Sequence, residues 1–363
     1  MKEFSHPTSL TPAALGYYMP AEWYPHESTW LAWPKNESTW RGLIPHVQQT
    51  YLEILIQLGE EERVDLLVDN ADEENLIRHQ LETTDIITDQ IFFHHIHTED
   101  SWIRDYGPNF ILRQSQGSTQ LAFNHWKFNS WGNKYPELQG DEAIPEHLEN
   151  ILGVPRFTPL QVLEGGAIDV NGDGICLVTE QCLLNPNRNP GSSKAQKEQC
   201  LKDYLGVVQI LWLHSGICGD DTDGHVDNIA RFVDSQTIVC PVEEDTSDEN
   251  YRPLQENYRR LMKARDLKGE AFKIVTLPMP GRLEGPNGRF PASYANFYIA
   301  NRVVLAPIFR HSNDQHALET LRKLFSNHRV VGLDCTALVK GMGGLHCITQ
   351  QQPLQELRGS GVS

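Results

Sequence analysis

Short apolar runs alternate with amphipathic stretches along almost the whole chain. Residues 28–33 predict a strand that ends at Pro34, because proline cannot continue a hydrogen-bonded ladder. Apolar residues then recur at helical spacing from Val47 to Leu58, and Gly59 is the expected end of that helix. Residues 64–68 predict the next strand, and the acids at 72–74 predict the start of another helix.

The same alternation continues towards the C-terminus. Helices are expected around residues 254–262 and 318–325, and residues 300–302 predict a hairpin turn. Further strands are predicted at 91–96, 207–212, 229–233, 272–275, 297–299 and 303–305. This order favours an α/β architecture in one continuous domain, 1–363, since no linker or low-complexity segment interrupts it. Periodicity leaves open whether the sheets are open, barrel-like or arranged as blades.

Composition and charge narrow the possible partners. The chain carries 31 basic and 48 acidic residues, which gives a net charge of −17 with histidine neutral. Such an acidic surface repels phosphate, so it disfavours nucleic-acid binding. It favours a small cationic partner, although acidity also serves solubility alone.

Other features bear on the compartment. No apolar run approaches the roughly 20 residues that a membrane-spanning helix needs, so we expect no membrane partner. Residues 1–6 show no secretory signal. The seven cysteines include no Cys-x-x-Cys pair, which predicts reduced thiols in a cytoplasmic protein rather than a disulfide framework or a zinc site.

Four segments carry more chemistry than packing requires. Residues 99–108 set acids, an arginine and Trp102 ahead of a Gly-Pro turn, and Glu164 directly precedes two glycines. Residues 220–227 place four acids and a histidine within eight positions, and residues 341–347 form a glycine-rich approach to a cysteine. A cysteine combined with a distant histidine is the expected sequence appearance of a thiol enzyme.

His225 and Asp227 are the most distinctive pair. In a strand, residues two apart point to one face, so an imidazole and a carboxylate would lie side by side. That arrangement suits a general acid/base next to a clamp for the substrate. It would equally suit two metal ligands with a further acid as the third, or a solvated strand end.

The whole set indicates a class of reaction. Glycines let the backbone approach a ligand closely, and the Cys347 thiol could be a nucleophile there if a neighbour lowers its pKa. Carboxylates bind the N–H groups of a guanidinium and would hold its planar cationic carbon near the sulfur. A cysteine protease needs an oxyanion hole instead, which so many acids would disfavour.

The chain resembles the agmatine deiminases, within the guanidine-modifying superfamily that also holds arginine and peptidyl-arginine deiminases. The resemblance covers nearly the whole chain in the expected order. It rests on residues 19–23, 25–27, 30–34, 102–108, 126–129, 163–166, 184–190, 222–228, 293–298 and 346–351. The sequence departs from the family pattern where Met342 interrupts the glycines, where Gly344 and Leu345 replace asparagine and isoleucine, and at residues 167–169.

The resemblance implies a pentein fold, a ring of five ββαβ units around a pseudo-fivefold axis. It implies hydrolysis of agmatine to N-carbamoylputrescine and ammonia, without metal or organic cofactor. Cys347 would be the nucleophile and His225 would relay protons. Asp105 and Asp227 would clamp the guanidinium, with Glu164 nearby as a substrate-binding residue.

The primary ammonium of agmatine also needs a partner, because burying it unpaired costs several kcal/mol. Asp220, Asp221 and Asp223 lie just upstream of His225, and Asp221 is the predicted partner. Trp102 is the predicted apolar or cation–π wall for the tail. The alternative is that these acids form a solvated loop.

Competing functions remain open at this point. A deiminase of peptidyl-arginine or free arginine would keep the thiol, histidine and acids, and Arg104 or Arg231 could meet the carboxylate of arginine. A catalytically inactive polyamine-binding protein is an alternative from another class. The sequence leaves the oligomeric state undetermined, with a homo-oligomer among the options.

Overall fold

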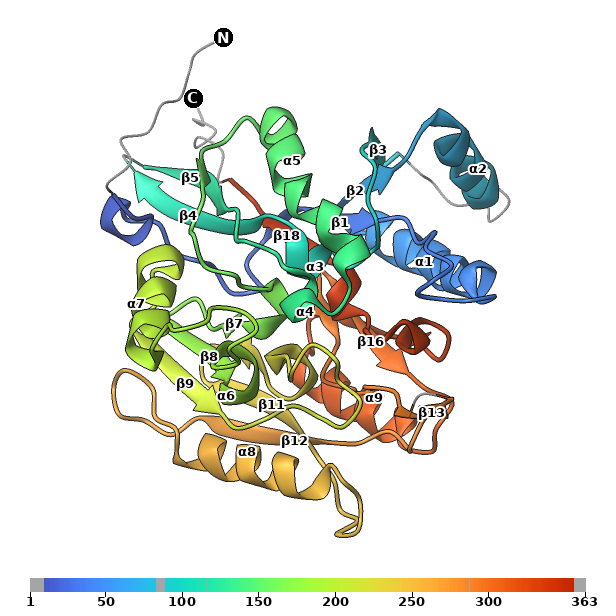
Figure 1. Cartoon of the computed structure of the whole chain (residues 1–363). Coiled ribbons are helices and arrows are strands. Elements are labelled where there is room, and N and C mark those ends of the chain that lie inside the picture. The colour runs from blue at the N-terminus through green and yellow to red at the C-terminus, as the bar shows by residue number, and fades with distance from the viewer. Residues whose placement is uncertain (1–9, 83–88, 116, 287, 356–363) are drawn as a thin grey trace.

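The computed structural model describes residues 10–82, 89–115, 117–286 and 288–355 (Figure 1). Residues 1–6, on which the absence of a secretory signal was predicted, lie outside the described residues. No helix in the described part of the chain combines the length and the apolar character needed to cross a membrane.

One strand order recurs around the molecule. Two antiparallel strands are followed by a helix, which returns the chain to add a third strand parallel to the second. In the first complete unit these are β4 (Asn109–Ser115), β5 (Ser118–Asn124), α5 (Ile144–Leu152) and β6 (Arg156–Phe157). The helix is required because parallel neighbours need a crossover connection.

Three further units repeat the ββαβ order with the same antiparallel and parallel pairings. They are β7 (Asp169–Val170), β8 (Ile175–Thr179), α7 (Lys194–Leu205) and β9 (Gln209–Leu213); β10 (Arg231–Asp234), β11 (Thr237–Val242), α8 (Tyr251–Lys263) and β12 (Lys273–Pro278); and β15 (Tyr298–Ile299), β16 (Val303–Ile308), α9 (Asp314–Leu324) and β17 (Arg329–Asp334).

The fifth unit joins the two ends of the described chain. β18 (Gln350–Pro353) pairs antiparallel with β1 (His26–Ala32), and α1 (Ile44–Gly59) leads to the parallel strand β2 (Arg63–Val68). α2 (Ala71–Glu82) and β3 (Ile91–His95) extend this sheet by one strand. The five sheets therefore form a closed ring, which Figure 1 shows with the first and last strands side by side.

Shorter elements lie between the units and within them. They are η1 (Ala13–Leu15), α3 (Ile103–Tyr106), α4 (Ser130–Asn133), η2 (Pro136–Ala143), η3 (Gly165–Ala167), α6 (Glu180–Leu183), η4 (Val226–Asn228), the hairpin β13 (Glu284–Gly285) with β14 (Gly288–Arg289), η5 (Leu338–Gly341) and η6 (His346–Ile348).

Most predicted elements are confirmed. The strands expected at 28–33, 64–68 and 303–305 correspond to β1, β2 and β16, and the helix from Val47 ends at Gly59. The predicted turn at 300–302 is closed by a hydrogen bond from Ala300 N to Val303 O at 2.9 Å.

The prediction that His225 and Asp227 share the face of a strand is wrong. His225 precedes the 3₁₀ turn η4, and the strand β10 begins only at Arg231. Asp223 and Gly224 both have positive φ, of 67° and 89°, so the chain reverses there instead of running on as a strand. The side chains of His225 and Asp227 are nevertheless fully buried.

Candidate active site

The ring brings one short segment of each unit to its centre. α3, η3, η4 and η6 each lie just before the first strand of a unit, and residues 293–296 hold the corresponding place before β15. α3 packs against η3 and η6, and η3 packs against η4. Equivalent positions of the five units therefore meet, although they are far apart in the sequence.

Cys347, in η6, is surrounded by polar groups. Its Sγ lies 3.3 Å from the backbone N of Gly344 and 3.5 Å from Nδ2 of Asn296, both of which donate to it. Asp227 Oδ2 lies 3.7 Å from the same sulfur. The thiol is only 5% exposed, so these neighbours control its ionisation.

Asp105 and Asp227 are both held firmly. Asp105 accepts hydrogen bonds from the backbone N of Gly166 at 2.9 Å and from Nε1 of Trp131 at 2.8 Å. Nδ1 of His346 lies 2.9 Å from Asp227, and its Nε2 lies 2.7 Å from Glu22. Both carboxylates are therefore fixed in place next to the thiol.

His225 lies next to Asp105. Its Nδ1 is 3.7 Å from Oδ1 of Asp105, and neither ring nitrogen has a hydrogen-bond partner in the described part of the chain. Burial lowers its pKa, but the Asp105 carboxylate, the adjacent Cys182 sulfur and the Glu164 carboxylate outweigh burial and raise the pKa well above the ordinary value. The imidazole is therefore protonated at neutral pH.

The charge balance of the site is negative. Burial, Asp227 and Asp105 together raise the pKa of Cys347 well above that of a free thiol, so the resting sulfur is protonated. Burial raises the pKa of Asp227 too, but His346 outweighs that effect and the carboxyl remains ionised with a lowered pKa. A bound cation would relieve this excess of negative charge.

A cavity of about 650 Å³ leads to the thiol. Cys347 and Asp105 line it, whereas His225 and Asp227 do not. Trp102 lines it as predicted, and so do Trp131, Tyr135, Glu137, Asp221, Arg41 and Lys340.

Of the three acids upstream of His225, Asp221 alone is among the residues that line this cavity. The Tyr135 hydroxyl donates a hydrogen bond to Asp221 Oδ2. Burial raises the pKa of the Asp221 carboxyl to about 6. Asp220 instead accepts from the backbone N–H groups of Thr222 and His225, at 2.9 and 3.2 Å. Asp223 pairs with Lys134 and Arg188.

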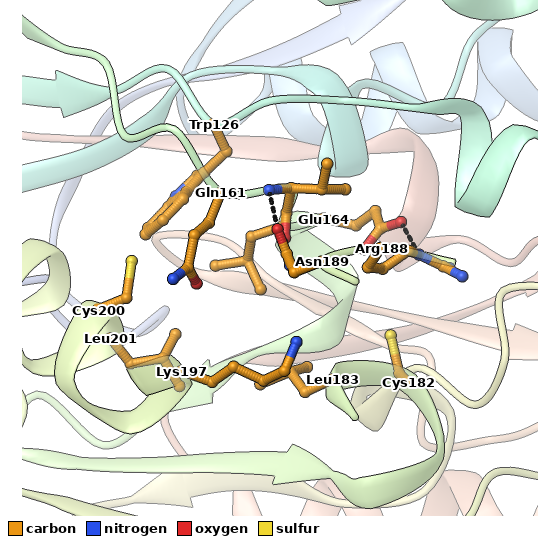
Figure 2. Close-up of a pocket in the computed structure, with 12 residues that line it drawn as sticks. Trp126, Gln161, Glu164, Cys182, Leu183, Arg188, Asn189, Lys197, Cys200 and Leu201 are labelled. Atoms are coloured by element: carbon orange, nitrogen blue, oxygen red, sulfur yellow. Dashed lines mark hydrogen bonds and ion pairs between the residues drawn. The ribbon is translucent and has the colours of Figure 1, made fainter. Parts of the chain in front are cut away.

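Glu164 faces a second, smaller cavity. Arg188 Nε donates to its Oε1 at 2.6 Å, as the dashed line in Figure 2 shows. This cavity, of about 20 Å³, is lined by Glu164 and Cys182 and not by His225 or Asp105. Glu164 thus lies close to His225 and Cys182 and does not line the large cavity.

The glycine-rich approach to Cys347 is explained by close packing. A Cβ on Gly343 would lie 2.3 Å from the Trp102 ring, and one on Gly344 would lie 2.2 Å from Asn296 Oδ1. A side chain at either position would displace a wall of the site. Met342 adopts φ 72°, a conformation that glycine takes with less strain.

Sequence reasoning assigned no role to Asn296, His346 or Trp131. Asn296 and His346 lie in segments that matched the family pattern, and Trp131 lies two residues beyond one of them. Asn296 and His346 each bond a residue from a different unit, and Trp131 bonds Asp105 of its own unit across 26 positions, so none of these contacts is visible in the sequence.

A ring of five ββαβ units with a thiol, a histidine and acids at its centre is the pentein architecture. A DDAH from Pseudomonas aeruginosa shares this fold, with a TM-score of 0.50, 13% identity, and coverage of 91% of this chain and 100% of that one. The model of the Porphyromonas-type peptidyl-arginine deiminase family matches residues 18–353, and the chain belongs to that family.

Two relatives are much closer than that DDAH. The agmatine deiminase of Medicago truncatula is 37% identical over 373 residues, which cover 94% of this chain and 98% of the relative. The solved agmatine deiminase of Enterococcus faecalis superimposes with a TM-score of 0.88 at 32% identity, covering 96% of this chain and 99% of that one.

Gly166 packs against three of the side chains that form the site. A Cβ there would lie 2.6 Å from His225 Nδ1, 2.9 Å from Asp105 Oδ1 and 3.0 Å from Asp227 Oδ2. We expect Gly166→Ala to fold but to release ammonia from a guanidinium substrate at least about 100-fold more slowly, since shifts near 1 Å cost that much.

Gly59→Ala is the matched control, because its Cβ would meet Ile91 at an ordinary 3.7 Å. It should retain full activity. Normal turnover in folded Gly166→Ala would show that the three side chains do not need their present spacing.

Proposed function

We propose that the protein hydrolyses agmatine to N-carbamoylputrescine and ammonia through a covalent intermediate on Cys347. The observation that carries the proposal is the placement of acids relative to one cavity. Asp105 lines it beside the thiol, Asp227 lies 3.7 Å from the same sulfur behind the lining, and Asp221 lies on its wall. Agmatine is a dication whose two charges are separated by four methylenes, so it fits acids at two separate places.

The first half of the reaction forms the carbon–sulfur bond. The guanidinium binds between Asp105 and Asp227 and offsets the negative charge that raises the pKa of Cys347, so the thiol loses its proton to solvent. The thiolate attacks the guanidinium carbon. Protonated His225 then donates its proton to one nitrogen, the C–N bond breaks, and ammonia leaves a cationic thiouronium on the sulfur.

The second half returns the enzyme to its starting state. Neutral His225 takes a proton from water as the oxygen attacks the thiouronium carbon. The C–S bond then breaks, the hydroxyl proton passes to the departing sulfur and restores the thiol, and N-carbamoylputrescine leaves. The same histidine thus serves as acid and then as base, which its place beside Asp105 supports, because the carboxylate stabilises the imidazolium form.

The tail of the substrate lies along the wall of the large cavity. Its ammonium pairs with Asp221, whose other contact is the Tyr135 hydroxyl. Trp102 provides an apolar face for the methylenes, and its indole N–H is already bonded to Asp100 at 3.1 Å. The indole is therefore held with one orientation.

One observation keeps arginine substrates as the second candidate. Arg41 and Lys340 also line the large cavity and could meet a carboxylate. Arg104 and Arg231, the cations suggested by the sequence, are 4% and 0% exposed, and they pair with Glu22 at 3.6 and 2.8 Å. Neither of those two lines the cavity.

Parallel incubation with agmatine, free arginine and an arginine peptide tests the proposal. We expect kcat/KM for agmatine to exceed the other values by at least about 100-fold, since a charge buried without its partner costs about 3 kcal/mol or more. Ammonia release and product mass would be measured for each compound.

Cys347→Ser is the control for the chemistry, and it should fold but form no product. A preference for arginine or the peptide would transfer the function to the second candidate. Binding of agmatine without ammonia release by the wild-type protein would indicate the inactive polyamine-binding protein.

The role of Asp221 is tested by comparing agmatine with butylguanidine, which has an uncharged tail. Hydrogen bonds to charged groups contribute about 1.5–3 kcal/mol, so Asp221→Asn should lower kcat/KM for agmatine by about 10- to 100-fold. Butylguanidine should be nearly unaffected. Equal losses on both compounds would remove Asp221 from the tail site.

The pH profile gives a second readout of the same group. Because the pKa of Asp221 is raised to about 6, the carboxylate is lost as pH falls through that value. KM for agmatine should then rise below pH 6 in the wild type but not in Asp221→Asn. Glu137→Gln, which changes another acid of the cavity wall, should keep the wild-type profile.

A further inference from the structure

A second group of side chains meets behind His225, away from the large cavity. Glu164, Cys182 and His225 each place one oxygen, sulfur or nitrogen atom within 4.8 Å of the others. All three residues are buried, at 1%, 1% and 0% exposure. Neither nitrogen of His225 makes a hydrogen bond of normal geometry in the described part of the chain, and the Cys182 sulfur is a close neighbour of the ring, so a nitrogen is available to a ligand that the two residues share.

From this geometry we propose an inhibitory zinc site formed by Glu164, Cys182 and His225. Thiolate, imidazole and carboxylate are the ligands that Zn²⁺ prefers, whereas Mg²⁺ and Ca²⁺ favour oxygen alone. Binding requires the Cys182 thiol, whose pKa is raised by burial, and the protonated His225 each to lose a proton to solvent. Zn²⁺ with the resulting thiolate, one carboxylate and a neutral imidazole is electrically neutral overall. Neutrality matters in a fully buried site, where uncompensated charge is costly.

The residues around Glu164 and Cys182 support zinc binding between them. Arg188 donates to Glu164 Oε1 at 2.6 Å and so orients the carboxylate, and its own charge is shared with Asp223. Figure 2 shows Glu164 and Cys182 on the wall of the small cavity. Its volume of about 20 Å³ holds roughly one water molecule, which would supply a fourth ligand.

The consequence for activity follows from His225. An imidazole with zinc on one nitrogen has no lone pair left to accept a proton from water, so it cannot cycle between the imidazolium and neutral forms that the reaction needs. Zinc at this site therefore inhibits the enzyme without occupying the substrate cavity, and a chelator leaves the turnover of zinc-free enzyme unchanged. Only this inhibition depends on the proposed function, because zinc binding itself requires no turnover.

The first experiment measures binding alone, with the full chain freed of metal. Zn²⁺ affinity is determined by competition with a chromophoric chelator, and Co²⁺ reports thiolate ligation by its charge-transfer absorption. We expect one ion per chain. Cys182→Ser should weaken Zn²⁺ binding by at least about 100-fold, since even indirect contacts to a metal cost 10- to 100-fold.

Two matched variants locate the ion. Cys200→Ser changes another cysteine on the wall of the small cavity and should bind zinc normally. Cys347→Ser should also bind normally. Loss of binding in Cys347→Ser with retention in Cys182→Ser would place the metal on the nucleophile and overturn the proposal, and so would the absence of any zinc binding by wild type.

The second experiment measures ammonia release with added Zn²⁺. Wild type and Cys200→Ser should be inhibited and recover in chelator, whereas Cys182→Ser should turn over without inhibition. If Cys182→Ser does not fold, Cys182→Ala replaces it, and a Zn²⁺-dependent rise in Tm of that variant equal to wild type would contradict the proposal. Zinc binding by a chain inactive on agmatine would refute the proposed function and not the site.

Discussion

The site depends on negative charge that the protein does not fully neutralise. Asp105 and Asp227 are buried beside Cys347, and taking carboxylates out of water is costly unless partners replace the solvent. Backbone and indole N–H groups hold Asp105, and His346 faces Asp227. These partners fix the carboxylates but leave the pKa of the thiol well above its ordinary value. In the proposed reaction a cationic substrate completes the charge balance, so that binding and activation of Cys347 are one event.

The ring of five units explains how so many polar groups can be buried together. Each unit contributes one short segment that lies just before its first strand. These segments pack against one another at the centre of the ring. A second network ties the centre to the scaffold. Arg231, fully buried, pairs with Asp169 at 2.5 Å and with Glu22 at 2.8 Å, and Glu22 in turn contacts His346. A substitution in this network would therefore disturb Asp227 from a distance.

The sequence predicted the local elements well because strand and helix patterns depend on neighbours in the chain. β1, α1, β2 and β16 follow directly from apolar spacing and from residues that end an element. Periodicity could not predict the closure of β18 on β1, which pairs residues more than 300 positions apart. That part of the fold came only from the resemblance to known deiminases.

The site was predicted unevenly for a related reason. Cys347, Asp105 and Asp227 are brought together in the structure, and Asp221 and Trp102 line the cavity as expected. The local geometry of His225 was wrong, since a turn with positive φ replaces the supposed strand. Asn296 and His346 were missed because a contact between units leaves no spacing in the sequence.

The charge preference of Cys347 tests most directly whether a cation completes the site. Chloroacetamidine and chloroacetamide have nearly the same size, but only the amidine is a cation. Each alkylation rate of Cys347 is divided by the rate with a free thiol, and peptide mass spectrometry identifies the modified residue. We predict a normalised rate for the amidine that is more than about tenfold higher, since one pKa unit of thiol activation is worth that factor. Equal normalised rates would contradict the claim that a cation completes the site.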